Sequence, residues 1–315
     1  MTTLNTDGPR LPLHVLDLNI RGWYHFAAKK GGGGMNSSFA PRLRLCGCVA
    51  LGAVFVFAPV SRAQMGGNNP TMMQNSNSMD QRLYVGTVDV RADREQGSAY
   101  ENFLKEKDLA KKIRMGNSFL EKYPKSPLAE RVDVGMMDVY RAQQDWKDVY
   151  QWADNALALQ PDDVDVLATV GWTIPHVYSP DDPNADHDLN KAETYAKHAL
   201  DVMAKMPKPP DLTDAQFEAA KAKRTFQAHS ALGLVYFRRE DYADSAKELE
   251  LSTKGNPAQD ATDLFVLGVD LQNLNRYSEA EDAFGGCSQI AGPLQNQCKQ
   301  SAVTAKAQPM QSKTN

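Results

Sequence analysis

An acidic segment in the middle of the chain has the spacing of a calcium-binding loop. From Asp182 to Glu193, oxygen-bearing side chains stand at positions 1, 3, 5, 7, 9 and 12, with an apolar residue at position 8. Ca²⁺ prefers such carboxylate and amide ligands, and EF-hand loops place them in this order. The sixth position requires glycine for a sharp turn, but here it is His187. The candidate ligands would be Asp182, Asn184, Asp186, Asp188 and Glu193.

The same segment is also typical of a solvated loop that leads into a helix. Asn190 would cap that helix, and Glu193 would stand at its third position, without any ion. Because the loop glycine is missing, we favour this ion-free interpretation, and we predict no metal site and no cofactor. Calcium or ligand binding by residues 181–193 stays as the alternative.

No set of residues in the sequence indicates a catalytic site. His176, His187 and His198 are spaced by eleven residues, which is about 16 Å along a helix, too far to share one ion. The sequence has no nucleophile elbow, no phosphate-binding glycine loop and no H-E-x-x-H motif. We therefore expect that the protein is not an enzyme.

Residues 35–63 have the order of a cleaved export signal. Two arginines precede an uncharged apolar run from residue 45 to residue 60, and small residues then stand at −3 and −1 before Gln64. The run is shorter than the ~20 residues of a membrane span, and an uncleaved anchor is the alternative. Residues 1–34 precede this complete signal, so we interpret them as a disordered extension that arises from gene calling.

Two cysteines, Cys287 and Cys298, remain after removal of the signal. Disulfides persist in the oxidising compartments that exported proteins occupy. Pro293 lies between the two cysteines and can stand at the start of a closing helix that carries Cys298. A disulfide would fasten this helix to the preceding one, and two free thiols are the alternative.

A repeat of 35 residues organises the helices expected in the C-terminal part. Each unit has two stretches with apolar residues at i, i+3, i+4 and i+7, which predicts two amphipathic helices. Small residues in both helices would let the backbones approach closely. The matched residues of the two units are Gly233 and Gly268, Tyr242 and Tyr277, Ser245 and Ala280, and Leu249 and Phe284.

The repeat resembles the tetratricopeptide repeat (TPR) family, whose pattern is W-x2-L-G-x2-Y, then A-x3-F, then P. Three degenerate units precede the clear pair: residues 99–123, residues 130–163, and a unit that starts at Val164 and has nine extra residues between its helices. A long helix from Asp214 to Phe237, begun by a capping box of Thr213 and Gln216, would follow. The resemblance implies an all-α fold, an α-solenoid of stacked antiparallel helix pairs.

The predicted organisation places this solenoid, with its closing helix, at residues 99–305. Residues 64–98 are rich in Met, Asn, Gly and Ser, cannot bury enough apolar surface to order, and are predicted to be a disordered linker. Residues 306–315 are predicted to be a disordered tail. Residues 1–63 carry a net charge of +5 and the remainder −9, which argues against a nucleic-acid binder because such proteins show a basic stripe.

In the TPR family the first helices form a concave face that binds a peptide, so the resemblance implies a protein or peptide partner, which the sequence does not identify. We expect an exported interaction module, in the periplasm of a bacterial envelope or secreted, that reaches membranes only through an uncleaved signal or its partner. An envelope-assembly factor at the outer membrane is the alternative. The candidate groove residues are Arg131, Asp138, Arg141, Trp172, His176, Phe237, Arg238, Gln272 and Asn273.

Overall fold

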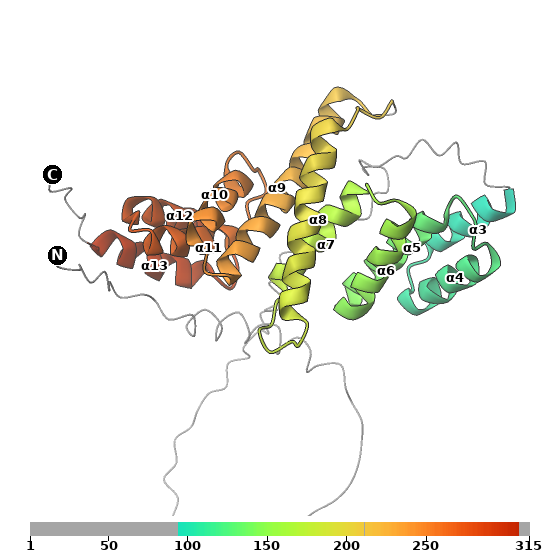
Figure 1. Ribbon diagram of the computed structural model, residues 1–315, viewed down its shortest axis with the longest axis horizontal. Coiled ribbons are helices and arrows are strands. Elements are labelled where there is room, and N and C mark those ends of the chain that lie inside the picture. Colours follow the sequence, from blue (N-terminus) through green and yellow to red (C-terminus); the bar gives the residue numbers. More distant parts are fainter. Residues whose placement is uncertain (1–93, 211, 309–315) are drawn as a thin grey trace, which may run out of the picture. The chain divides into compact units, whose positions relative to one another are not determined.

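The computed structural model describes residues 94–210 and 212–308, and these are α-helices joined by turns with no strand among them (Figure 1). The all-α prediction is therefore confirmed. The extension, the export signal, most of the linker and most of the tail lie outside the described residues. The helices are α3 (Arg94–Lys105), α4 (Leu109–Lys122), α5 (Ala129–Gln143), α6 (Trp146–Leu159), α7 (Val164–His176), α8 (Ala185–Lys205), α9 (Asp214–Arg238), α10 (Tyr242–Thr253), α11 (Ala261–Asn273), α12 (Tyr277–Gln289) and α13 (Gln295–Ala307).

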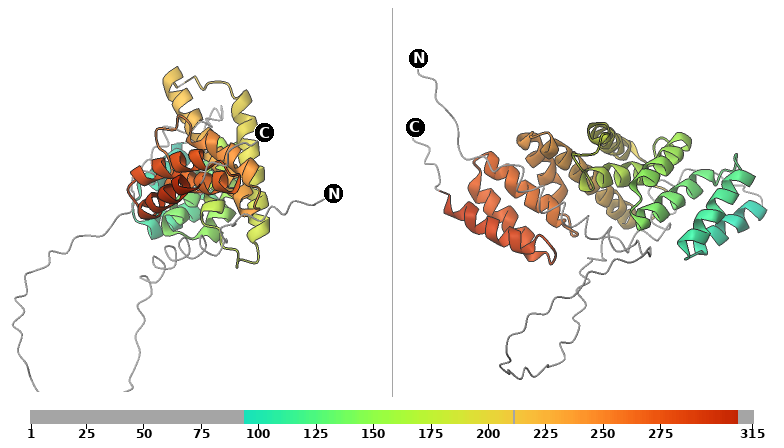
Figure 2. Two further views of the ribbon diagram at one scale, coloured as in Figure 1. Left: turned by 90° about the vertical axis from the view of Figure 1, so that its left-hand side faces the viewer. Right: turned by 90° about the horizontal axis from the view of Figure 1, so that it is seen from below.

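Each of these helices packs on the next along the chain. Short turns join α5 to α6, α9 to α10 and α11 to α12, so the two helices of each pair run in opposite directions. Alternate helices also touch, because α7 packs on α9, α9 on α11, and α11 on α13. Figure 2 shows the last helices, drawn in red, lying side by side. The succession of pairs agrees with the predicted units.

The turns within three pairs share one backbone feature. Gln144, Glu240 and Asn275 follow the first helix of their pairs with φ angles of 60°, 62° and 60°. A residue in this left-handed conformation reverses the chain at a helix end. Glu240 and Asn275 are 35 residues apart, so the sequence repeat reappears in the backbone.

Two glycines allow the close packing that the repeat predicts. A Cβ atom at Gly233 would lie 2.5 Å from Leu249 Cγ, and one at Gly268 would lie 2.5 Å from Phe284 Cε1. The Ser245 hydroxyl also donates a 2.8 Å hydrogen bond to the Gly233 carbonyl. The close approach of paired helices is confirmed at both positions.

The long helix α9 begins as expected. The Thr213 side chain accepts a hydrogen bond from the Gln216 amide, and the Gln216 side chain accepts one from the Thr213 amide. The helix has 25 residues. The predicted capping box and the predicted length are both confirmed.

Helix α8 begins earlier than expected, at Ala185, so the predicted cap at Asn190 is wrong. Asn190 and Glu193 lie inside the helix. The physical reason is that Leu189 is buried and extends the apolar stripe of α8 toward its start. Asp186 and Asp188 also place negative charge in the first turn, where the helix dipole favours it.

Cys287 in α12 and Cys298 in α13 form a disulfide, with their Cα atoms 5.8 Å apart. Both side chains are fully buried. The predicted disulfide is confirmed, and it fastens the closing helix to its neighbour. No helix in the described part of the chain combines the length and apolar character that crossing a membrane requires.

Candidate functional site

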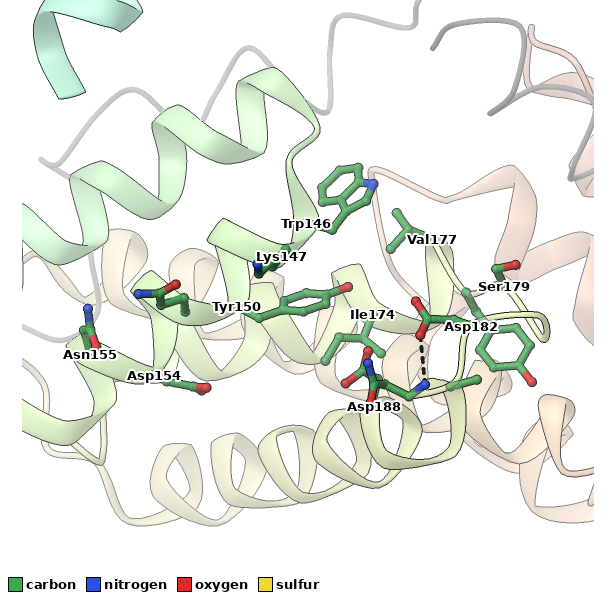
Figure 3. Close-up of a pocket in the computed structure, with 14 residues that line it drawn as sticks. Trp146, Lys147, Tyr150, Asp154, Asn155, Ile174, Val177, Ser179, Asp182 and Asp188 are labelled. Atoms are coloured by element: carbon green, nitrogen blue, oxygen red, sulfur yellow. Dashed lines mark hydrogen bonds between the residues drawn. The ribbon is translucent and has the colours of Figure 1, made fainter. Parts of the chain in front are cut away.

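A cavity of about 480 Å³ lies among α6, the C-terminal end of α7 and the first turn of α8. Its wall combines aromatic and acidic side chains. Figure 3 shows Tyr150 reaching from α6 toward Ile174 and the carboxylates of the following turn. The aromatic residues are Trp146, Tyr150 and Tyr178, and the carboxylates are Asp154, Asp182 and Asp188.

Burial and the charge of this pocket both change the pKa of Tyr150. Burial raises the pKa of the Tyr150 phenol well above its ordinary value, and the nearby carboxylates of Asp188 and Asp182 raise it further. The phenol therefore stays protonated and can donate a hydrogen bond. A wall with this composition suits a ligand group that brings an apolar surface and a positive charge.

Two local contacts fix the acidic side of the pocket. Asp182 accepts a 2.8 Å hydrogen bond from the Asn184 amide, which holds the turn before α8 (Figure 3). Asp154 accepts 2.7 Å hydrogen bonds from Lys191 and from the Tyr195 hydroxyl. Asp154 is thus partly neutralised. His187 Nδ1 lies 3.2 Å from Asp188, and Lys147 adds a positive charge to the wall, so the pocket carries charges of both signs.

The candidate calcium ligands lie partly in a turn and partly in the helix that comes after it. Asp182 and Asn184 stand in the turn, whereas Asp186 and Asp188 occupy the first turn of α8. Glu193 lies farther along α8, where its carboxylate contacts Lys197 and Arg239, both at 2.5 Å. The predicted ligands therefore do not lie on one continuous loop.

Two of the three predicted groove residues of α5 are in contact. Arg131, Asp138 and Arg141 are all half-buried. Arg141 donates a 2.8 Å hydrogen bond to Asp138. In α11, Gln272 and Asn273 are also half-buried at the end of the helix.

The predicted groove residues of α7 and α9 include close ring contacts. Trp172 and His176 stand one turn apart in α7, with ring centroids 3.9 Å apart. The Arg238 guanidinium lies 5.0 Å from the centre of the Tyr178 ring. Phe237 is only 2% exposed, so its role in this structure is packing.

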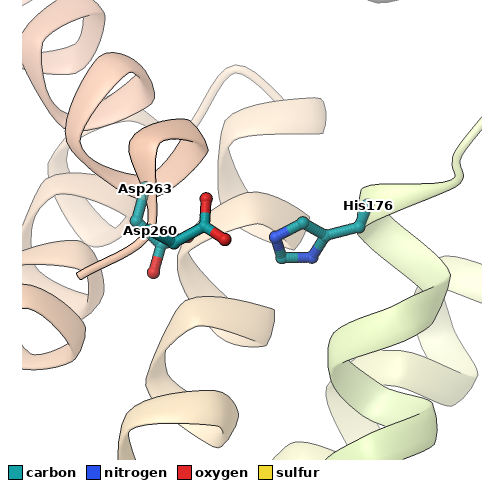
Figure 4. A group of neighbouring side chains, drawn as sticks. All are labelled: His176, Asp260 and Asp263. Carbon is teal, nitrogen blue, oxygen red and sulfur yellow. The ribbon is translucent and has the colours of Figure 1, made fainter. Parts of the chain in front are cut away.

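The structure also brings together a group that sequence spacing did not reveal. His176 at the end of α7 faces Asp260 and Asp263 at the start of α11 (Figure 4). One potential ligand atom from each residue lies within 4.8 Å of the other two. Burial, together with the neighbouring Asp260, raises the pKa of Asp263 to about 7. Only the close spacing of the two aspartates could have signalled part of this group.

The chain matches no family model and no curated protein in the comparisons. Its function is therefore argued from the repeat and from the geometry of these side chains.

Proposed function

We propose that the protein is an exported interaction module of the TPR type, whose helix pairs form an α-solenoid that holds a partner polypeptide in the groove of its first helices. The observation that carries this proposal is the agreement of sequence and backbone periods. The glycine contacts at Gly233 and Gly268, and the left-handed residues Glu240 and Asn275, each recur after 35 residues. Repeats of this length stack helix pairs and create extended binding surfaces.

The disulfide supports the export part of the proposal. Cytosolic thiols stay reduced, whereas bridges such as Cys287–Cys298 persist in the periplasm and outside the cell. This agrees with the signal-like order of residues 35–63. The periplasm is the compartment we propose.

The pocket beside α6 supports the binding part. Its volume of about 480 Å³ lies in the range of small-molecule pockets and leaves room for one side chain. The aromatic wall and the carboxylates of Asp182 and Asp188 fit a lysine or arginine side chain, whose aliphatic stem would lie against Tyr150, while Lys147 in the same wall would weaken that attraction. Because the pocket lies mainly on the second helices α6 and α8, we propose it as a separate anchor, beside the groove, for one residue of the partner.

Affinity capture from envelope extracts tests the proposal. The full chain is used as bait, beside a double variant of the predicted groove, Arg131→Glu with Arg141→Glu. We expect the double variant to lose a partner that the wild type retains, because it reverses two charges of the predicted groove and removes the hydrogen bond from Arg141 to Asp138. Membrane fractionation of the captured complex then separates a soluble adaptor from an assembly factor at the outer membrane.

A matched control is Lys247→Glu on the exposed surface of α10. It reverses one charge outside the predicted groove and should retain the partner. Retention of the same partners by the groove variant, at the same affinity as the wild type, would contradict the proposed groove. Folding of every variant is checked by circular dichroism.

A further inference from the structure

We propose that His176, Asp260 and Asp263 bind a divalent transition-metal ion of the zinc class, which ties α7 to α11. This site shares His176 with the predicted groove, but ion binding goes beyond the proposed function. The three side chains come from two helices that lie far apart in the sequence. The proposal depends on the side-chain arrangement in Figure 4.

The imidazole of His176 is prepared to accept a metal through one nitrogen. Its Nδ1 lies 2.7 Å from the Trp172 carbonyl oxygen. Because a carbonyl only accepts hydrogen bonds, Nδ1 carries the proton and Nε2 keeps its lone pair. Metal-binding histidines commonly donate their other N–H to a backbone carbonyl in this way.

The second nitrogen is the atom that lacks a partner. His176 Nε2 is buried from solvent and has no hydrogen bond in the described part of the chain. Figure 4 shows the imidazole directed at the carboxylates of Asp260 and Asp263. A buried acceptor nitrogen that faces two carboxylates can therefore serve as the nitrogen ligand of a cation.

Both carboxylates are held in place by neighbouring donors. The hydroxyls of Ser230 and Ser252 donate hydrogen bonds of 2.8 and 2.9 Å to the two oxygens of Asp263. One oxygen of Asp260 accepts a 2.6 Å hydrogen bond from the Thr262 amide as the N-cap of α11. Such contacts orient ligands around a metal, and the two negative charges would balance a divalent ion.

The three ligand atoms lie farther apart than they would around a bound ion. In a tetrahedral site with bonds of about 2.0–2.2 Å, ligand atoms stand about 3.3–3.6 Å apart, whereas the candidate atoms lie within 4.8 Å of one another. Binding would therefore draw the side chains together by up to about 1 Å. The guanidinium of Arg238, which acts on the imidazole from α9, opposes the cation and so limits the affinity.

The donor set selects the class of metal. One imidazole nitrogen with two carboxylate oxygens suits zinc and its neighbours, whereas Ca²⁺ and Mg²⁺ take oxygen ligands alone. Three protein ligands leave a fourth position of a tetrahedral ion for water.

Calorimetric titration of the metal-free full chain with ZnCl₂ tests the proposal. We expect one ion per chain, and binding at least tenfold weaker in His176→Gln. Asp260→Asn should weaken binding in the same way while α11 is preserved, because asparagine caps a helix as well as aspartate does. The matched control is His187→Gln, which removes an exposed histidine beside Asp188 and should bind as the wild type does.

Two results would overturn the site. One is a wild-type chain that binds no Zn²⁺, and the other is unchanged binding in Asp260→Asn and His176→Gln. Loss of binding only in His187→Gln would overturn it as well and would move the ion to the acidic insert. If His176→Gln does not fold by circular dichroism, Asp260→Asn decides the question.

Discussion

Replacing Gly268 by alanine tests the packing on which the repeat depends. The added Cβ would lie 2.5 Å from Phe284 Cε1 and 2.7 Å from two further atoms of the same ring. Carbon atoms pack at about 3.5–4.0 Å, so the methyl group would intrude by about 1 Å. Phe284 is fully buried and its ring cannot move into solvent. The helix pair α11 and α12 must therefore separate.

The size of the effect follows from two opposing terms. Forcing an extra methyl group into a packed core costs about 1–3 kcal/mol. Alanine is also a better helix former than glycine by about 1 kcal/mol, which partly offsets that cost. The second term is measured separately with Gly285→Ala in α12, where a Cβ meets no atom within 4 Å. The difference between the two variants isolates the packing cost.

Urea unfolding followed by far-ultraviolet circular dichroism gives the free energy of unfolding of each variant. We expect Gly268→Ala to be less stable than Gly285→Ala by about 1–3 kcal/mol. Gly285→Ala itself should be slightly more stable than the wild type. Equal stabilities for the two variants would refute the close contact between α11 and α12.

Two further predictions concern a covalent and an ionisable group. Replacing Cys287 and Cys298 by serine should lower the free energy of unfolding by about 2–3 kcal/mol, because a short closed loop is lost from the unfolded chain; equal urea midpoints for variant and oxidised wild type would contradict this. Burial raises the pKa of Asp270 to about 8, so the folded chain keeps a proton that the unfolded chain releases near pH 4. The resulting stabilisation is complete below about pH 4 and is lost as the pH rises toward 8, so Asp270→Asn should show a smaller decline of unfolding free energy than wild type between about pH 5 and pH 8. Equal declines in urea unfolding at those two pH values would rule this out.

Local signals in the sequence predicted several features that the structure bears out. The capping box at Thr213 fixes the start of α9, because its two hydrogen bonds involve neighbouring residues only. Gly233 and Gly268 predicted close helix pairs because each stands at the small-residue position of the 35-residue repeat. The disulfide was predictable because few cysteines remain to pair.

Features that depend on contacts between distant residues were not predicted from the sequence. The start of α8 was misplaced because the burial of Leu189 against a neighbouring helix outweighs the capping preference of Asn190. The grouping of His176 with Asp260 and Asp263 depends on how α7 and α11 pack around α9. No spacing rule reports contacts between helices so far apart in the chain.

The disulfide between α12 and α13 makes the two ends of the described helices unequal. Terminal helices have fewer neighbours than interior ones, and they are the first to detach and reattach in solution. A covalent link opposes detachment of α13, whereas α3 is held by noncovalent contacts, chiefly the packing of Tyr100 and Phe103 and the ion pair of Glu95 with Lys122. Amide hydrogens should therefore exchange with deuterium first in α3. Unfolding should begin at this helix and reach the disulfide-linked helices α12 and α13 last.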